Sequence, residues 1–442
     1  MPSNRDGGVR KRRTTRRGFL TTASLAACGA PTIVAAAALG TAKAPAASER
    51  ITVGIIGVGG RGSAHLQAFL PESQVVAVAD PYLQRREAAQ QRVEAHYGGA
   101  RTKGTYRGCA AYRDFRELLA RDDIDAVSIC TPDHWHAVQA VAAAASGKDV
   151  MCEKPLSLTV AEGRAVCDAI QRYGRVFQHG TQRRSEGGFA LACELVRNGR
   201  IGQLHTVRVS SEPSHVNPNE PPAPVPPGFD YDLWLGPAPR APYSPRRCRT
   251  PWWYFIADYT IGFVAGQGVH FTDIAQWGLG TDDTGPVEVE GHGTIPTDGL
   301  CDTATEWHVE MRFANGVKLI YDDDRAFPMG VIFEGTTGTV RALCGGLSAE
   351  PPSLLSTVLE PHELRLRRPR GHVADFVHCV KTREPTAAPV EAAHRATSLC
   401  HLTHIAILTG RKLKWDPVRE QFPDDPAANR HLARSLRSPW HL

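Results

Sequence analysis

A glycine-rich turn follows residue 56, where Gly57, Gly59 and Gly62 make a G-x-G-x-x-G pattern. An apolar, β-branched run precedes the turn and a helical pattern follows it. In this context backbone N–H groups and the helix N-terminus can face a pyrophosphate, because glycine has no Cβ to block the approach. The next apolar run ends in Asp80, whose carboxylate can accept hydrogen bonds from ribose hydroxyls. These residues predict a dinucleotide site, and a decorative turn is the alternative.

Asp80 also bears on which dinucleotide binds. Its carboxylate would repel a 2′-phosphate, so the sequence favours NAD. Arg85 and Arg86 follow shortly afterwards, which leaves NADP as the alternative.

A lysine stands at the end of another apolar run, in the stretch MCEKPLSL at residues 151–158. At a partly desolvated site the pKa of Lys154 would fall, so that it could relay a proton or stabilise a developing alkoxide near neutral pH. The alternative is a surface lysine paired with Glu153. The position of Lys154 at a strand end, directly before Pro155, favours the first interpretation.

The elements that must position these residues alternate between strand and helix patterns. The strand patterns are ITVGII, SQVVAVAD, DAVSICTP, DVMCEKP and RVFQHGTQ. This alternation predicts a doubly wound parallel sheet, in which ligands bind beyond the carboxyl ends of the strands. Three such ends carry polar residues and are expected to converge on one cleft: Thr131-Pro132, Glu153-Lys154-Pro155 and residues 178–182.

The first 46 residues read as a secretory leader, with a basic start, an apolar middle and a small-residue end. The stretch TRRGFL that starts at Thr15 matches the twin-arginine export pattern, so we expect export by that machinery to the periplasm or another extracytoplasmic site. Cleavage is expected after Ala44 or Ala46.

Cys28 ends a Leu-Ala-Ala-Cys stretch and would bear a lipid if the leader were a lipoprotein signal. The apolar part is interrupted by Thr, Gly and Pro, so no stable membrane span is expected.

Charge and cysteine content exclude other classes of protein. Of the 51 Lys and Arg residues, eight lie in the leader together with one of the 46 Asp and Glu residues, so the rest of the chain is slightly acidic. Nothing therefore indicates a nucleic-acid partner. The 11 cysteines are scattered, and several lie in apolar runs, such as Cys130 and Cys400. We expect reduced cysteines, in agreement with export of an already folded protein.

Four motifs, in this order, resemble the glucose-fructose oxidoreductase / inositol dehydrogenase (Gfo/Idh/MocA) family: residues 57–62, TPDHWHA at 131–137, GKDVMCEKPLSLTVAEGR at 147–164 and GVHFTDIAQWGLG at 268–280. The likeness covers most of the chain after the leader and is strongest to the twin-arginine-exported bacterial branch. It implies an N-terminal Rossmann domain over residues 48–181. An α/β domain with a large, open, mostly antiparallel sheet would follow at residues 182–442.

The second half is compatible with that architecture. Its short alternating strand patterns are QLHTVRVSSEP, VEVEGHGTI, ATEWHVEMRF, VKLIYDD, VIFEGTTGTVRAL and LRLRR. The proline-rich residues 217–245 make a long excursion, over the cleft or into a subunit contact. Because an open sheet leaves one face uncovered, a homo-oligomer is expected.

The resemblance also implies chemistry. Family members that oxidise sugars or cyclitols transfer hydride from a secondary alcohol to nicotinamide while a base takes the hydroxyl proton. Lys154 matches one of the polar groups at that alcohol. His270 matches the family's active-site histidine, which could accept the proton near neutral pH, and a hydrogen-bonded core histidine is the alternative. Asp273, three residues further on, would orient the histidine or hold a substrate hydroxyl.

One position departs from the family. Many of its dehydrogenases have an aspartate four residues before the histidine, where this chain has Gly266 in FVAGQGVH. The missing carboxylate removes one way to orient and tune the proposed base. Either Lys154 and His270 act with substrate groups alone, or the reaction differs.

The predicted cofactor site gathers residues from the turn and from the strand ends. An H-x-H metal pair at His134 and His136 is disfavoured because no acidic or cysteine ligand lies at suitable spacing, so no metal is expected. The aromatic run at Trp252, Trp253 and Tyr254 could stack on a sugar or belong to the core. The cofactor-binding residues are predicted to be Gly57, Gly59, Gly60, Arg61, Gly62, Asp80, Thr131, Pro132, His134, His136, Glu153, Lys154 and Gln182.

Three functions follow from these expectations. The first is an exported NAD(H)-dependent oxidoreductase that acts on a secondary alcohol of a sugar, sugar derivative or cyclitol. The second is a redox-assisted glycosidase or lyase that recycles its NAD. The third is a non-catalytic sugar-binding protein that retains NAD.

Overall fold

The computed structural model describes residues 50–102, 106–216 and 218–442. The leader, with the twin-arginine pattern and Cys28, lies outside the described residues, so export and lipidation stay predictions. No described helix is long and apolar enough to cross a bilayer.

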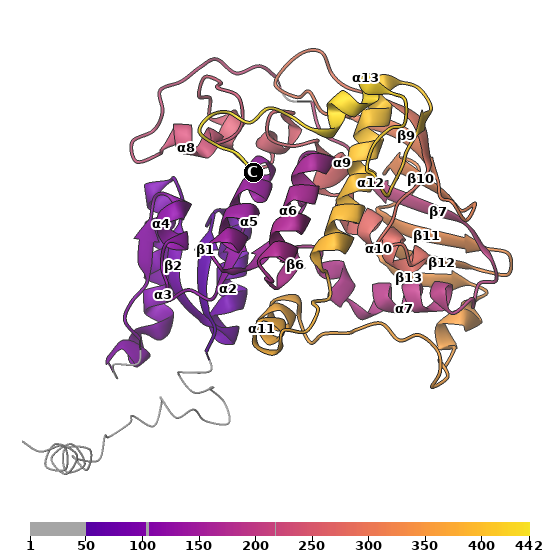
Figure 1. The fold of residues 1–442 in the computed structure, drawn as a ribbon, viewed down its shortest axis with the longest axis horizontal. Helices are drawn as coiled ribbons and strands as arrows, with labels where there is room; N and C mark the ends of the chain where they lie inside the picture. Colours follow the sequence, from indigo (N-terminus) through magenta and orange to yellow (C-terminus); the bar gives the residue numbers. More distant parts are fainter. Residues whose placement is uncertain (1–49, 103–105, 217) are drawn as a thin grey trace, which may run out of the picture. The chain divides into compact units, whose positions relative to one another are not determined.

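The first sheet is parallel throughout, with strand order β3-β2-β1-β4-β5-β6, as in a dinucleotide-binding fold (Figure 1). Its strands are rich in Val, Ile and Ala, which suits burial on both faces. They are β1 (Thr52–Ile56), β2 (Gln74–Ala79), β3 (Ala110–Tyr112), β4 (Ala126–Ile129), β5 (Asp149–Cys152) and β6 (Phe177–His179). The prediction of a doubly wound sheet is confirmed.

Helices from both halves of the chain cover this sheet. Phe376, on a helix from the second half, meets Phe69 edge to face with ring centroids 6.2 Å apart. Thr159 caps α6 by accepting a hydrogen bond from the backbone N–H of Glu162 at 3.3 Å. The helices of the first half are α2 (Gly60–Glu72), α3 (Leu83–Thr102), α4 (Phe115–Leu119), α5 (His136–Ala145) and α6 (Val160–Arg172), with α11 (His372–Thr382) returning from the second half.

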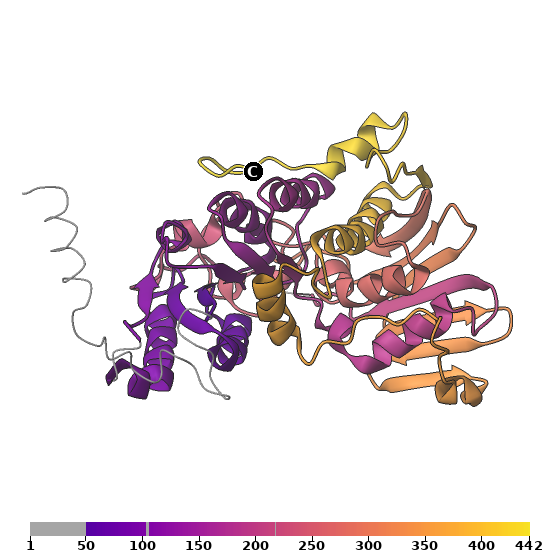
Figure 2. The same cartoon turned by 60° about the horizontal axis from the view of Figure 1, so that its bottom comes forward.

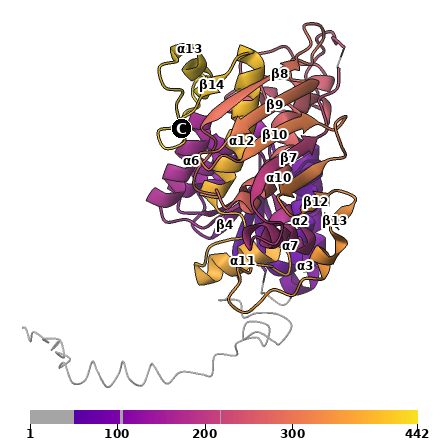
Figure 3. The same ribbon diagram turned by 90° about the vertical axis from the view of Figure 1, so that its right-hand side faces the viewer.

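The second sheet has eight strands in the order β13-β12-β11-β7-β10-β9-β8-β14 and faces the viewer in Figure 3. All its neighbours are antiparallel except the parallel pair β7 and β10, so the predicted mostly antiparallel sheet is confirmed. The strands are β7 (Leu204–Ser211), β8 (Glu288–Thr294), β9 (Glu306–Arg312), β10 (Lys318–Asp323), β11 (Gly330–Gly335), β12 (Thr339–Leu343), β13 (Gly346–Glu350) and β14 (Leu413–Lys414).

The two faces of this sheet differ. One packs its apolar residues under α7, α10 and α12 in the largest buried cluster. The other carries charged side chains in pairs across neighbouring strands, such as Lys318 with Glu310 at 2.8 Å and Arg208 with Glu334 at 3.0 Å. The remaining helices are α7 (Gly187–Arg197), α8 (Tyr231–Leu235), α9 (Phe263–Gly266), α10 (Val269–Leu279), α12 (Val390–Thr409) and α13 (Pro426–Asn429). Self-association through the open face stays a prediction.

The strand prediction is wrong in one false strand and in three strands that it missed. LRLRR, at residues 364–368, is not a strand: the Leu366 N–H donates to Glu194 at 2.8 Å, and its neighbouring arginines reach carboxylates on nearby helices. The alternation of Leu and Arg in this segment reflects ion pairing of the arginines rather than the hydrogen-bond pattern of a β-strand. Conversely, three strands were not predicted. The strands β3 and β14 are only three and two residues long, and β13, with the sequence GLSAE, has no β-branched residue and pairs only as the outer strand of a hairpin.

The described cysteines confirm the sequence prediction. All ten are free thiols, and most are buried in the core. The fold therefore depends on packing and polar contacts rather than on disulfides.

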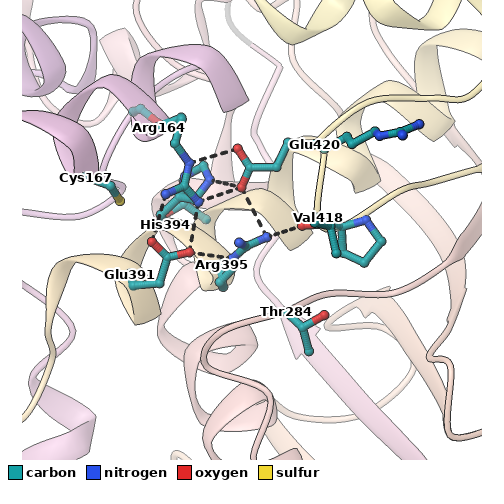
Figure 4. A network of polar contacts seen from close by, with 12 residues as sticks. Arg164, Cys167, Thr284, Glu391, His394, Arg395, Val418 and Glu420 are labelled. Atoms are coloured by element: carbon teal, nitrogen blue, oxygen red, sulfur yellow. Dashed lines mark hydrogen bonds and ion pairs between the residues drawn. The ribbon is translucent and has the colours of Figure 1, made fainter.

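A polar network joins α6 to the last long helix and the segment after it (Figure 4). Arg164 contacts Glu391 at 2.9 Å and Glu420 at 2.7 Å. His394 also reaches Glu420 at 2.7 Å, and Arg395 reaches Glu391 at the same distance. The network thus ties the nucleotide half of the chain to its C-terminal part.

Two segments cover the upper edge of the first sheet, and we name them the strap (residues 218–256) and the tail (residues 433–442). The strap contains α8 and the short 3-10 turns η5 (Arg246–Cys248) and η6 (Trp252–Phe255). The tail is drawn in yellow and passes over α5 and α6 in both Figure 1 and Figure 2. Arg437 of the tail donates to the carbonyl of Gly236 in the strap at 2.8 Å.

Candidate active site

The glycine turn forms the cradle that the sequence predicted. Gly57 has φ +80°, and a Cβ there would lie 2.9 Å from the carbonyl of Cys130. A Cβ at Gly62 would lie 1.9 Å from the Gly57 oxygen. Only glycine allows this close approach of α2 to the turn, which leaves the start of the helix open to a phosphate.

Asp80 lies at the carboxyl end of β2, as predicted. Its two carboxylate oxygens accept backbone N–H bonds from Val58 and Tyr82, each at 2.9 Å. These bonds aim the carboxylate at the region beside the glycine turn, where ribose hydroxyls would lie in a dinucleotide fold.

A cavity of about 540 Å³ connects the turn to the strand ends. Its walls combine Rossmann residues with aromatic and basic residues of the strap. Of the predicted cofactor-binding residues, those that line it are Gly57, Gly59, Gly60, Arg61, Asp80, Thr131, Pro132, Glu153 and Lys154. Two of the three strand ends therefore converge as expected, whereas residues 178–182 do not line the cavity. The cradle fits an extended dinucleotide.

The strap closes one side of this cavity. Its Gly228 carbonyl accepts a hydrogen bond from Leu83 N–H at 2.8 Å, and its Asp230 N–H donates to the Pro81 carbonyl at 3.0 Å. The Phe229 ring packs on Tyr82 with centroids 5.1 Å apart. The three residues that the strap contacts here, Pro81, Tyr82 and Leu83, immediately follow Asp80 in the sequence. The strap therefore crosses the ribose end of the site. Of the two predicted placements for the proline-rich excursion, the described residues favour the one over the cleft.

Glu153 is the centre of a buried cluster that the sequence did not reveal. His65 Nε2 lies 2.8 Å from Glu153 Oε1, His65 Nδ1 lies 2.9 Å from Ser128 Oγ, and Arg61 also pairs with Glu153. Burial opposes both charges, yet contacts with Cys130 and Glu153 raise the pKa of His65 to about 10. Against the cost of burial, the hydrogen bond and charge of His65, followed by the charge of Arg61, hold the pKa of Glu153 well below its usual range. His65 is the third residue after Gly62, and a polar residue on the inner face of α2 was the available signal.

Lys154 extends from the end of β5 toward the second domain. Its ammonium donates to the backbone carbonyl of Gly266, and it lies 5.4 Å from the centroid of the Tyr254 ring. Burial lowers the pKa of Lys154, against the opposing charges of Glu153 and Asp133. A lysine poised this way can give up or accept a proton near neutral pH more readily than one in water.

His270 lies near the start of α10 and is 7% exposed. Burial, and then the charge of Lys154, keep its pKa well below the usual value, so the imidazole is neutral at pH 7. Its Nδ1 atom is buried and has no hydrogen-bond partner among the described residues, and His270 is not among the residues that line the cavity. A neutral imidazole with a free nitrogen can accept a proton, as the prediction requires.

Asp273 has a different partner from the one expected. Both of its oxygens accept hydrogen bonds from Arg184 Nε at 2.9 Å, and Arg184 also pairs with Asp282 at 2.7 Å. Among the described residues, no hydrogen bond or ion pair joins the Asp273 carboxylate to the His270 ring. Its carboxylate is thus committed to anchoring the segment after β6 onto α10.

His134 and His136 do not line the cavity, although both are predicted to bind the cofactor. His136 bonds the carbonyls of Pro155 at 2.6 Å and Thr131 at 2.9 Å, and so ties together two loops that do line it. His134 bonds the carbonyl of Trp234 in the strap at 3.0 Å. Gln182 also lies off the cavity wall, in the 3-10 turn η4 (Gln182–Ser185). No group of metal ligands occurs in the described ranges.

Asp133 and Tyr254 are the residues that sequence reasoning passed over. Asp133 is 1% exposed, and burial raises its pKa to about 7, against the opposing charge of Lys154. An acidic residue directly after the strand-end Thr131-Pro132 was the available signal. Tyr254 lines the cavity beside Lys154, but its run of aromatics pointed equally to stacking and to the core.

Comparison with known proteins agrees with this geometry. Residues 51–181 match a family described as "Oxidoreductase family, NAD-binding Rossmann fold", and residues 215–442 match its C-terminal alpha/beta domain. The structure of levoglucosan dehydrogenase in complex with NADH and levoglucosan shares the fold, with a TM-score of 0.60, 19% identity and coverage of 83% of this chain and 99% of that one.

Two curated relatives are similar in sequence. Myo-inositol 2-dehydrogenase of Thermotoga maritima is 27% identical over 281 residues, which are 62% of this chain and 68% of that enzyme. A glycosyl hydrolase family 109 protein of Shewanella pealeana is 33% identical over 207 residues. That match spans 43% of this chain and less than half of the relative, 44%.

The predicted cofactor and enzyme class are both confirmed. Residues 51–181 are an NAD-binding Rossmann domain of an oxidoreductase family. Binding of NAD by Gly57–Gly62 and Asp80 in particular stays a prediction. Because both halves of the chain match its models, the chain belongs to the Gfo/Idh/MocA family of oxidoreductases.

Proposed function

We propose that this protein oxidises a secondary alcohol of a sugar, sugar derivative or cyclitol. The observations that carry the proposal are that Lys154, with its lowered pKa, lines the cavity, and that the neutral His270 lies near enough for the charge of Lys154 to lower its pKa. Bound NAD supplies the hydride acceptor. The protein's own residues must then hold the alcohol oxygen and remove its proton.

Lys154 and His270 divide that work. The ammonium of Lys154 can donate a hydrogen bond to the alcohol oxygen and stabilise negative charge as it develops there. The neutral His270 imidazole can take the proton. The Glu153 cluster fixes the backbone of residue 154, because Glu153 Oε2 accepts the Lys154 N–H at 3.2 Å.

Purified protein, supplied with NAD and a panel of sugars and cyclitols, tests the proposal through NADH absorbance. Lys154→Ala should lower kcat about 10²- to 10⁴-fold, because a positioned proton-handling group contributes about that much. Lys381→Ala, an exposed lysine on α11, is the matched control and should keep full activity. Wild-type turnover in Lys154→Ala would refute the assigned role.

A second candidate function is a redox-neutral glycosidase or lyase, in which a ring carbon is oxidised, the leaving group is eliminated, and the carbon is reduced again. The strap favours it, because a cavity closed over the ribose end suits a cofactor that stays bound between turnovers. Similarity to the family 109 protein points the same way. Aryl glycosides distinguish the candidates: aglycone release without net NADH supports the second, and net NADH supports the first. Sugar binding without either product would indicate a non-catalytic protein.

Export by the twin-arginine route completes the proposal. Its support is the TRRGFL stretch at residues 15–20. Cell fractionation tests it, since replacing Arg16 and Arg17 with Lys should retain the protein in the cytoplasm. If this variant were still found in the periplasmic fraction, the proposal would be contradicted.

A further inference from the structure

At Gly266, where many family members have an aspartate, the space for a side chain is filled by the ring of Tyr254. Gly266 ends α9, and a Cβ built there would lie 3.2 Å from Tyr254 Cδ1 and 3.2 Å from Phe263 Cδ1. Those contacts are already tight for a single methyl carbon. The further atoms of a carboxylate would need the space that the Tyr254 ring fills, so an acid at 266 and a tyrosine at 254 compete for one volume.

The Tyr254 ring is held firmly in that volume. It stacks on Trp253 with ring centroids 3.7 Å apart and an angle of 24°, and it contacts Phe263 at 5.6 Å. Its face lies toward the Lys154 ammonium, 5.4 Å from the ring centroid. Packing from three sides therefore presents the ring to the same lysine that donates to the Gly266 carbonyl.

The phenol is available to a ligand. Tyr254 lines the cavity together with Glu153 and Lys154, and no described residue hydrogen-bonds its hydroxyl. Burial, followed by the negative charges of Asp133 and Glu153, raises the pKa of Tyr254 well above its usual value. The hydroxyl is therefore a neutral group that can both donate and accept a hydrogen bond at neutral pH, unlike a carboxylate.

We propose that Tyr254 takes the place of the missing acid and hydrogen-bonds the reacting alcohol as the third polar side chain beside Lys154 and His270. This inference rests on the proposed function. It answers the question raised by Gly266: the site keeps three polar groups, but the third arrives from the strap rather than from α9. Because a phenol carries no charge, it orients the alcohol without adding a second base.

Tyr254→Phe is the direct test, since it keeps the ring and removes only the hydroxyl. We expect kcat on the best sugar or cyclitol to fall about 10- to 100-fold, while the NADH dissociation constant and the melting temperature stay at wild-type values. Tyr173→Phe, at an exposed site on the far end of α6, is the matched control. Wild-type kcat in Tyr254→Phe, with Lys154→Ala inactive, overturns the inference and leaves the proposed function standing.

The shared volume is tested separately by stability, which needs no substrate. Gly266→Asp alone should lower the melting temperature, and Tyr254→Ala in the same chain should relieve much of that loss, so that the two changes are not additive. Strictly additive losses would show that the positions do not compete and would overturn the inference. If no sugar or cyclitol is turned over by wild-type protein, the proposed function fails, and this cycle still reports on the competition.

Discussion

At the scale of single residues, the site depends on where a side chain is absent and on which side chains can exchange a proton. The glycines leave room for a phosphate, and Lys154 and His270 have pKa values displaced by burial toward forms that can exchange a proton. Asp273 shows the converse, since a carboxylate bonded twice by Arg184 has little capacity left for substrate.

Gly62 gives a sharp prediction at this scale. Gly62→Ala would place a methyl carbon 1.9 Å from the Gly57 oxygen, so the turn must open and the phosphate cradle is lost. We expect NADH affinity, measured by fluorescence titration, to fall at least 100-fold. Gly98→Ala, where a Cβ meets nothing within 4 Å, is the control. Unchanged affinity in Gly62→Ala would mean that the cofactor does not use this cradle.

At the scale of elements, helices of the second half complete the layers of the first sheet, and the Arg164 network fixes one of these contacts. Buried side chains of α12 lie in the same apolar cluster as those of α6. The order of elements along the chain therefore does not match their grouping in space.

Acid should weaken this network through Glu420. Burial opposes its ionisation, but His394 and Arg164 outweigh that cost and lower its pKa to about 2. A carboxyl group whose pKa is lower in the folded state than in the unfolded state stabilises the fold. The stabilisation is complete at pH values above the unfolded-state pKa of about 4.3, and it is lost as the pH falls toward the folded-state pKa of about 2. Glu420→Gln should therefore cost about 1–2 kcal/mol in urea unfolding at pH 7 and progressively less below about pH 4.

The control for Glu420 is Glu72→Gln, an exposed carboxylate at the end of α2. It should change the free energy of unfolding by less than about 0.5 kcal/mol at either pH. A Glu420→Gln deficit that is equally large at pH 7 and pH 3 would assign the loss to packing rather than to charge.

At the scale of the whole molecule, the strap and the tail enclose the cofactor cavity. Trp440 of the tail meets Trp135 edge to face at 4.6 Å, and Trp135 lines the cavity. Arg437 pairs with Asp232 of the strap at 2.7 Å. The last residues of the chain thus hold a segment that lies some 200 positions earlier.

Loosening the tail should speed the release of the cofactor. Trp440→Ala removes the contact with Trp135, and we expect NADH to dissociate about 5- to 10-fold faster, which corresponds to about 1 kcal/mol. A stopped-flow chase of bound NADH measures the rate. Val418→Ala, 86% exposed in the same C-terminal region, should release NADH at the wild-type rate. Equal rates in all three proteins would show that the tail does not retain the cofactor.

The sequence by itself determined the parts of this protein that depend on local pattern. Glycine spacing, the apolar run that ends in Asp80 and the lysine before Pro155 each specify a turn or a strand end, and parallel strand ends must meet at one edge. Those predictions hold because backbone sterics and burial act within a few residues. The missed strand β13 and the false strand at 364–368 lie where that local signal is weak.

Only the tertiary structure decided which side chains share a volume. Three contacts show this: Tyr254 fills the space beside Gly266, Arg184 pairs with the carboxylate of Asp273, and His65 pairs with Glu153. The residues in these pairs are 12 to 89 positions apart in the sequence. No periodicity encodes such pairs, because they depend on how packed elements meet. The sequence thus determined the NAD-binding class of the fold and the turn that forms its cradle, and the fold decided which polar groups are left free to act on the substrate.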